Sequence, residues 1–115
     1  MSDRVQRLAQ LQDLELMIRE VEDPASKKKE EALGFSVEGL QQLQTARGRL
    51  VKQIPTSDFR LYQRVRRKYE RAVVPVINRI CLGCFQALPT SSKPTVSETS
   101  ALPTCENCGR ILYWL

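Results

Sequence analysis

Apolar side chains recur with a helical period over residues 3–22. The repeating positions are Leu11, Leu14, Ile18 and Val21. Their spacing of three, four and three residues is the heptad pattern of a helix that packs along another helix. Further apolar residues, Val5, Leu8 and Met17, widen this face beyond a narrow stripe. The pattern therefore predicts a helix that meets more than one partner helix.

A second helical pattern runs from Val37 to Ile54, after a short and highly charged helical piece predicted for residues 24–33. Its apolar positions are Leu40, Leu43, Leu50 and Ile54, and Arg47 occupies the one position that breaks the seam. Ser36 can cap this helix at its start. Pro55 cannot continue a helix, so the second helix is expected to end there.

A third helix is predicted after Pro55, with Ser57 or Asp58 as its cap. Its apolar and aromatic positions are Phe59, Leu61, Tyr62, Val65 and Tyr69. The short connections favour two or three antiparallel helices over residues 1–71, and a coiled-coil-like hairpin is the simplest arrangement. Because so short a region makes a thin bundle, closure by a homodimer through the helices is the alternative.

The character of the chain changes at Ala72. Residues 73–80 are rich in β-branched side chains and predict a strand, and Pro75 within them indicates an edge strand. Residues 89–104 are rich in Ser, Thr and Pro and predict a loop or an irregular hairpin, whereas residues 110–115 are strand-like again. The predicted fold is therefore mainly α with a small β region.

No apolar run is long enough to span a membrane, and no basic segment with a following apolar stretch opens the chain. We therefore expect a cytoplasmic protein with no membrane partner. In that reducing compartment, regularly spaced thiols are more often metal ligands or redox groups than structural disulfides.

All four cysteines fall into two knuckles of the same spacing, Cys81-Leu-Gly-Cys84 and Cys105-Glu-Asn-Cys108. Two intervening residues let a tight turn aim both sulfurs at one ion, and Zn²⁺ prefers four ligands at tetrahedral corners. Gly83 and Gly109 are expected to supply the unusual dihedral angles of such turns. The pattern predicts a zinc ribbon over residues 72–115 that binds one structural Zn²⁺.

Three alternatives use the same cysteines. Ordinary cysteines or two disulfides are the first, and a thioredoxin-like redox pair is the second. That redox motif usually opens a helix, whereas strands are predicted beside both knuckles. Iron in place of zinc is the third alternative, because a four-thiolate site accepts either metal.

The predicted site argues for a binding module and against an enzyme. A closed set of four thiolates leaves no position for water or substrate. The chain also contains no histidine, the commonest general base, and no glycine-rich phosphate loop. We expect the metal to supply most of the folding free energy of residues 72–115, so that a chelator melts this region and leaves the helices largely intact.

The formal net charge of +5 is concentrated in residues 47–79, which hold ten basic and two acidic side chains. Six of the basic residues lie on the predicted third helix: Arg60, Arg64, Arg66, Arg67, Lys68 and Arg71. Helical spacing places Arg64, Lys68 and Arg71 on one face, which can follow the phosphates of DNA or RNA. The other interpretation is a solvated face that pairs with the acidic first helix, where Asp13, Glu15, Glu20 and Glu22 lie.

The end of the chain is unusually apolar. Strand alternation places Tyr113 and Trp114 on opposite faces of the last strand. We therefore expect one of them to pack against the helices or to face a partner.

These residues together resemble the bacterial family of coiled-coil proteins that end in a four-cysteine zinc ribbon. The resemblance covers roughly residues 55–115 and rests on three strings: Val73-Val74-Pro75-Val76, Cys81-Leu-Gly-Cys84 with the following Leu88-Pro89, and Cys105-Glu-Asn-Cys108-Gly109-Arg110-Ile111-Leu112-Tyr113. Tyr62 and Arg66 are also similar to the helix that leads into the family's ribbon. Family members commonly carry a longer helical hairpin, so this chain resembles a shortened member. They have been linked to flagellar regulation, to chaperone-like roles in type III secretion and to nucleic-acid binding.

We therefore carry three hypotheses for the function. The first is a protein-binding adaptor or chaperone-like regulator that uses the helical faces. The second is a nucleic-acid-binding regulator that uses the basic helix over residues 60–71 and the ribbon. A thiol oxidoreductase is a distant third.

Overall fold

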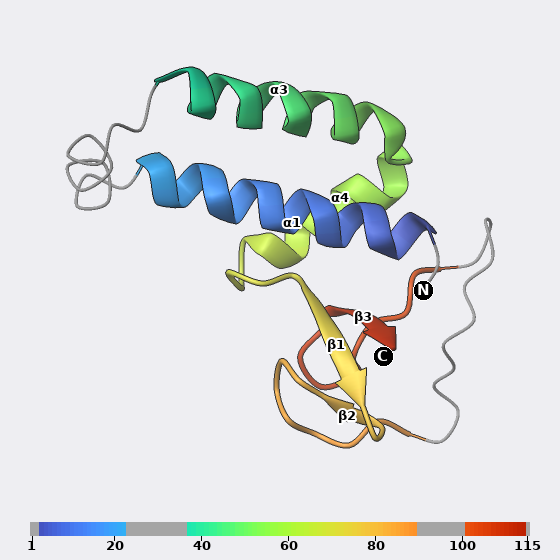
Figure 1. The fold of residues 1–115 in the computed structure, drawn as a ribbon. Coiled ribbons are helices and arrows are strands. Elements are labelled where there is room, and N and C mark those ends of the chain that lie inside the picture. Colours follow the sequence, from blue (N-terminus) through green and yellow to red (C-terminus); the bar gives the residue numbers. More distant parts are fainter. Residues whose placement is uncertain (1–2, 23–36, 90–100, 115) are drawn as a thin grey trace.

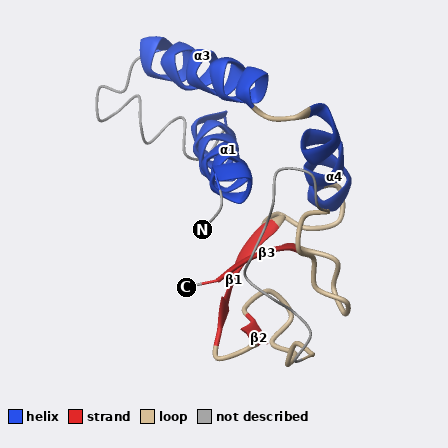
Figure 2. Cartoon of the chain, turned by 90° about the vertical axis from the view of Figure 1, so that its right-hand side faces the viewer, coloured by secondary structure: helices blue, strands red, loops and turns tan. Residues whose placement is uncertain are grey.

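Helices and a small sheet follow one another along the chain in the computed structural model, which describes residues 3–22, 37–89 and 101–114. The described helices are α1 (Asp3–Glu22), α3 (Val37–Gln53) and α4 (Thr56–Arg66). The described strands are β1 (Val73–Ile77), β2 (Ile80–Cys81) and β3 (Ile111–Trp114). In both Figure 1 and Figure 2, α1 lies between α3 and the sheet. The fold is thus mainly helical with a small three-stranded sheet.

The first two predicted helices are confirmed almost to the residue. α1 and α3 lie side by side and run in opposite directions, because Glu22 contacts Gln44 while Glu15 contacts Arg47 further back along α1. Most of the predicted seam positions on the two helices are half-buried. The helical piece predicted over residues 24–33 lies outside the described residues.

The predicted cap of the third helix is wrong. α4 begins after Pro55 without any side-chain cap. Asp58 is buried and accepts two hydrogen bonds from Arg4, at 2.9 Å from Nε and 2.8 Å from Nη2. A two-point contact between a guanidinium and a carboxylate is strong and directional, so Asp58 joins α4 to α1 instead of capping its own helix.

The predicted end of the third helix is also wrong. α4 stops at Arg66, and the backbone N–H groups of Lys68 and Tyr69 both donate to the carbonyl of Val65, each at 3.0 Å. Arg67, Lys68 and Arg71 therefore follow the helix and do not continue the face that Arg64 begins. Tyr69 leaves the helical path and packs against the core.

The sheet has the strand order β2-β1-β3. β1 and β2 form a hairpin in which Ile77 pairs with Ile80. Asn78 and Arg79 make the turn with φ of 52° and 61°, as a two-residue hairpin turn of the right twist requires. β3 runs parallel to β1, with Val73 opposite Ile111.

The prediction that Pro75 marks an edge strand is wrong, because β1 is the central strand. Proline has no N–H, and here it stands at the outer end of the short ladder between β1 and β2. Its carbonyl still accepts a hydrogen bond from Leu82 N at 3.0 Å. The missing N–H of Pro75 therefore removes only one hydrogen bond, at the end of the ladder to the two-residue strand β2.

The helices cover one face of the sheet with a core that both regions share. Val5, Leu8 and Leu11 of α1 are buried together with Val73 and Ile111 of the sheet. Ile54, Leu102, Ala72 and the α4 residues Tyr62 and Val65 complete this cluster, here called the helical core. The predicted regions 1–71 and 72–115 therefore meet along a continuous apolar contact.

A buried glutamine ties α1 to the central strand. The Gln12 amide nitrogen donates to the carbonyl of Val73 at 3.0 Å, and its amide oxygen accepts from Val73 N at 2.8 Å. The side chain thus makes the pair of bonds that a neighbouring strand would otherwise make. α1 is anchored to β1 by polar as well as apolar contacts.

The other face of the sheet carries the cysteines. Val74, Val76, Leu88 and Leu112 are buried with Cys81 and Cys105 in a second cluster. Tyr113 packs against the helical core and Trp114 against the cysteine cluster. The predicted placement of these two aromatics on opposite faces is confirmed.

Candidate metal centre

Two turns of the same construction carry the cysteines. In the first, Phe85 N donates to the carbonyl of Cys81 at 2.7 Å, and Cys81 N donates to the carbonyl of Gln86 at 3.1 Å. In the second, Gly109 N donates to the carbonyl of Cys105 at 2.8 Å, and Cys105 N donates to the carbonyl of Arg110 at 2.9 Å. The two knuckles therefore hold their sulfurs in the same local geometry.

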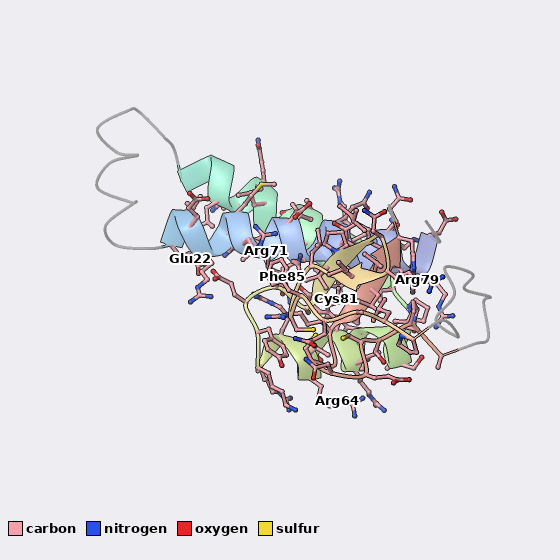
Figure 3. All side chains as sticks on the ribbon, turned by 90° about the horizontal axis from the view of Figure 1, so that it is seen from below. Glu22, Arg64, Arg71, Arg79, Cys81 and Phe85 are labelled. Atoms are coloured by element: carbon pink, nitrogen blue, oxygen red, sulfur yellow. The ribbon has the colours of Figure 1, made fainter. Side chains whose placement is uncertain are left out.

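The four cysteine sulfurs form one cluster. All four Sγ atoms lie within 4.8 Å of one another. The Sγ atoms of Cys81 and Cys108 are 3.8 Å apart, and those of Cys84 and Cys105 are 3.6 Å apart. Four sulfurs around one ion at a bond length of about 2.3 Å would be about 3.8 Å apart in a tetrahedron. Figure 3 shows sulfur atoms close together beside Cys81.

The spacing also decides against the disulfide alternative. All four cysteines are free, and the shorter of the two separations between the knuckles, 3.6 Å, greatly exceeds an S–S bond of about 2.05 Å. One sulfur of each pair belongs to each knuckle, so the cluster closes the two turns onto each other. The residues can hold a metal ion with four ligands.

The protein environment shifts the pKa values of the cysteine thiols in different directions. Burial raises the pKa of Cys81 and raises that of Cys108 to about 12. The Asn107 side chain is the main cause that lowers the pKa of Cys84, to about 6. A divalent ion held among the four sulfurs would favour the thiolate form of each cysteine.

Gly83 and Gly109 are glycines for different structural reasons. Gly109 has a φ of 81°, as predicted for an unusual turn dihedral. Gly83 has no such angle, so that prediction is wrong: a Cβ atom there would lie 2.6 Å from Nη1 of Arg110. Gly83 leaves room for the Arg110 side chain, which passes against its backbone and would have to move if a larger residue stood there. The first knuckle places Phe85, with φ of 63°, at the position that Gly109 takes in the second.

The predicted basic face is divided in the structure. Arg60, Arg64, Arg67, Lys68 and Arg71 are exposed, and Figure 3 shows Arg64 at the margin of the molecule. Arg66 instead turns inward, where its Nε lies 3.7 Å from Glu15 and its Nη1 donates to the carbonyl of Glu70. Among the described residues, Arg66 is the member of this set that pairs with α1. The other five form no ion pair in the described part of the chain.

Glu15, which the sequence analysis named only as one of four acidic partners for the basic helix, contacts both α3 and α4. It accepts hydrogen bonds from Arg47 of α3, at 2.9 Å, and from the hydroxyl of Tyr62 of α4. Burial and then the bond to Glu15 raise the pKa of Tyr62. The signal that could have found it is Arg47, the one charged residue in the α3 seam.

None of the helices among residues 3–22, 37–53 and 56–66 combines the length and the apolarity that a membrane crossing needs.

Two solved bacterial structures are similar to this chain. CT398 from Chlamydia trachomatis matches 82% of the chain with 30% sequence identity and a TM-score of 0.62. The HP0958 protein from Helicobacter pylori matches 80% of it with 25% identity and a TM-score of 0.59. The chain covers 40% and 38% of those two chains, so it spans about two fifths of their length. No protein-family model and no curated protein matches. The neighbours and the cysteine cluster fit a bacterial helical protein with a four-cysteine site.

Proposed function

We propose that this chain is a non-catalytic interaction module folded around one structural Zn²⁺, held by Cys81, Cys84, Cys105 and Cys108. The observation that carries the proposal is the sulfur cluster, whose separations match a tetrahedral four-thiolate site. When bound, the ion supplies folding free energy and no chemistry. A closed ligand set has no open position for a substrate, which supports a binding role.

We further propose that the chain is a shortened member of the bacterial family of coiled-coil proteins with a zinc ribbon. The antiparallel α1 and α3 then form the hairpin, and β1 to β3 with the two knuckles form the ribbon. The likeness to two bacterial structures and the string from Cys105 to Tyr113 support this assignment.

The partner that we propose is a protein, with the chain acting as an adaptor or chaperone-like regulator. Apolar side chains that the described fold leaves exposed support this role: Phe85 is 70% exposed and Met17 is 47% exposed. A second copy of the chain that packs on the helices is the alternative occupant. Light scattering of the zinc-loaded protein over a concentration series separates a monomer that recruits another protein from a homodimer.

A nucleic-acid-binding regulator is the second candidate. It is favoured by the exposure of Arg60, Arg64, Arg67, Lys68 and Arg71, none of which is paired within the described residues. Each phosphate contact made by such residues adds affinity that falls with salt.

Fluorescence anisotropy of labelled DNA and RNA oligomers over a salt series tests the second candidate. The zinc-loaded wild type is compared with an Arg64→Glu/Arg67→Glu variant, which leaves Arg66 and its contacts in place. Tight, salt-dependent binding that the variant loses would favour the nucleic-acid role. Weak binding that the variant does not change would favour the protein-binding role.

A further inference from the structure

Arg110 joins its own knuckle to the segment that follows α4. Its own carbonyl closes the second knuckle by accepting from Cys105 N at 2.9 Å. Its Nε donates to the carbonyl of Arg71 at 3.1 Å. Its guanidinium carbon lies 3.8 Å from the centre of the Tyr69 ring. The side chain therefore spans from the second knuckle to the segment that follows α4.

On its way the Arg110 side chain crosses the first knuckle. A Cβ atom at Gly83 would lie 2.6 Å from Nη1 and 2.7 Å from Cδ of Arg110, so any side chain there would require the Arg110 side chain to move. Gly83 also donates its N–H to the sulfur of Cys81 at 3.4 Å. The path of Arg110 thus depends on the two knuckles lying against each other.

We propose that Arg110 is a positioning residue that couples metal binding to residues 67–71. The proposal rests on the four-cysteine metal site of the proposed function and adds a means of regulation to it. Four thiolates around a divalent ion leave a formal charge of about −2, which attracts the Arg110 guanidinium across Gly83. Without the ion, the bonds that close the knuckles are lost, and Arg110 leaves both Gly83 and the Tyr69 ring.

The coupling has a consequence for the surface of the molecule. Residues 67–71 carry the exposed cations Arg67, Lys68 and Arg71, so metal occupancy fixes where these charges stand. Coupling between two sites is reciprocal. A ligand that holds Tyr69 and Arg71 in their present position therefore raises the metal affinity by the same factor by which the bound metal raises the affinity for that ligand.

A set of variants of the full chain tests the coupling through zinc affinity, measured by competition with a chromophoric chelator. Arg110→Ala is expected to weaken zinc binding by about tenfold, because it removes a cation–π contact and a charge-assisted hydrogen bond. Arg110→Lys keeps the charge but loses the planar stack and the Nε bond. It is therefore expected to weaken zinc binding nearly as much as Arg110→Ala. Tyr69→Leu is expected to weaken binding although it lies outside both knuckles, whereas Tyr69→Phe, which keeps the ring, leaves it unchanged.

The double variant decides between coupling and a local structural role. If Arg110 acts through Tyr69, the zinc affinity of the Arg110→Ala/Tyr69→Leu protein is no lower than that of the single variant with the lower zinc affinity. Losses that multiply, or a Tyr69→Leu protein with wild-type zinc affinity, would overturn the proposal.

A second readout follows the side chain itself. In NMR spectra of the zinc-loaded wild type, the Arg110 Nε–H signal is expected to be shifted by the Tyr69 ring. The shift should vanish in Tyr69→Leu and after zinc removal, and a shift that survives zinc removal would contradict the coupling. Failure of the metal site can be distinguished from failure of the coupling. If the metal site were wrong, the wild type would bind no more zinc than a Cys84→Ser protein.

Discussion

Gln12 offers a sharp test of how α1 is held on the sheet. Its side chain is 4% exposed and makes both bonds with Val73, at 3.0 Å and 2.8 Å. Gln12→Met keeps the length of the side chain and a good helix former, but leaves the N–H and the carbonyl of Val73 without partners. Each buried unsatisfied group costs about 1–3 kcal/mol, so for the two groups we expect a loss of about 2–6 kcal/mol in the free energy of unfolding.

The matched control is Gln10→Met, at an exposed position of the same helix. Urea unfolding of the zinc-loaded proteins, followed by circular dichroism and by Trp114 fluorescence, gives the free energies. The control is expected to stay within about 0.5 kcal/mol of the wild type. If Gln12→Met unfolds at the same urea midpoint as the control, the anchoring of α1 by this clamp is refuted.

A charged replacement at the same position adds a pH dependence with a defined sign. In Gln12→Glu, one oxygen can still accept from Val73 N, but the other faces the Val73 carbonyl. Repulsion and burial raise the pKa of the introduced carboxyl in the folded state above its unfolded value. The variant is therefore expected to be least stable above that raised pKa and to regain stability, relative to wild type, as the pH falls through it. A stability difference that does not change with pH would contradict this geometry.

Other substitutions test separate parts of the structure. Gly48→Ala in α3 and Gly109→Ala in the second knuckle both add a Cβ to open space, yet opposite effects are expected. The first is expected to stabilise by up to about 1 kcal/mol as a helix position, and the second to cost about 1–2 kcal/mol at φ of 81°; urea midpoints that move in the same direction would contradict this. Tyr62→Phe removes one donor from Glu15 and is expected to cost about 1 kcal/mol in the same assay, and an unchanged midpoint would show that Arg47 and Arg66 suffice. Leu8→Ala, at a fully buried position of the helical core, is expected to cost about 2–5 kcal/mol and to lower the helix and Trp114 transitions together, whereas separate transitions would contradict a shared core.

Periodicity and spacing predicted the parts of the structure that depend on local sequence. The positions of α1 and α3 followed from apolar residues at helical steps and the end of α3 from Pro55, and the sulfur cluster followed from the two matching cysteine knuckles. Both signals are strong because each repeats within the chain. The alternation that separates Tyr113 from Trp114 has the same origin.

Contacts between distant residues account for the errors. Asp58 looked like a helix cap, but Arg4, which is 54 positions away, takes both of its oxygens. Pro75 looked like an edge residue, but it lies in the central strand, at the outer end of a ladder to β2 that is only two residues long. The role of Gly83 depends on the path of Arg110, which no local pattern shows.

The shared core also changes one expectation. Residues 72–115 were expected to melt alone when the metal is removed, with the helices left intact. Because Val5, Leu8 and Leu11 bury their side chains against β1 and β3, loss of the sheet also removes the packing surface of α1. We therefore expect a chelator to lower the helix signal as well, and unchanged helix content after zinc removal would contradict this.

The central claim is that four cysteines hold one zinc ion, and native mass spectrometry of the purified protein tests it most directly. The account predicts one species whose mass exceeds that of the chain by a single zinc ion less the protons of the thiols. Substitution of Cys84 or Cys105 by Ser should remove that species. A folded chain that carries no metal, or one whose mass shows iron or two disulfides instead, would contradict the claim.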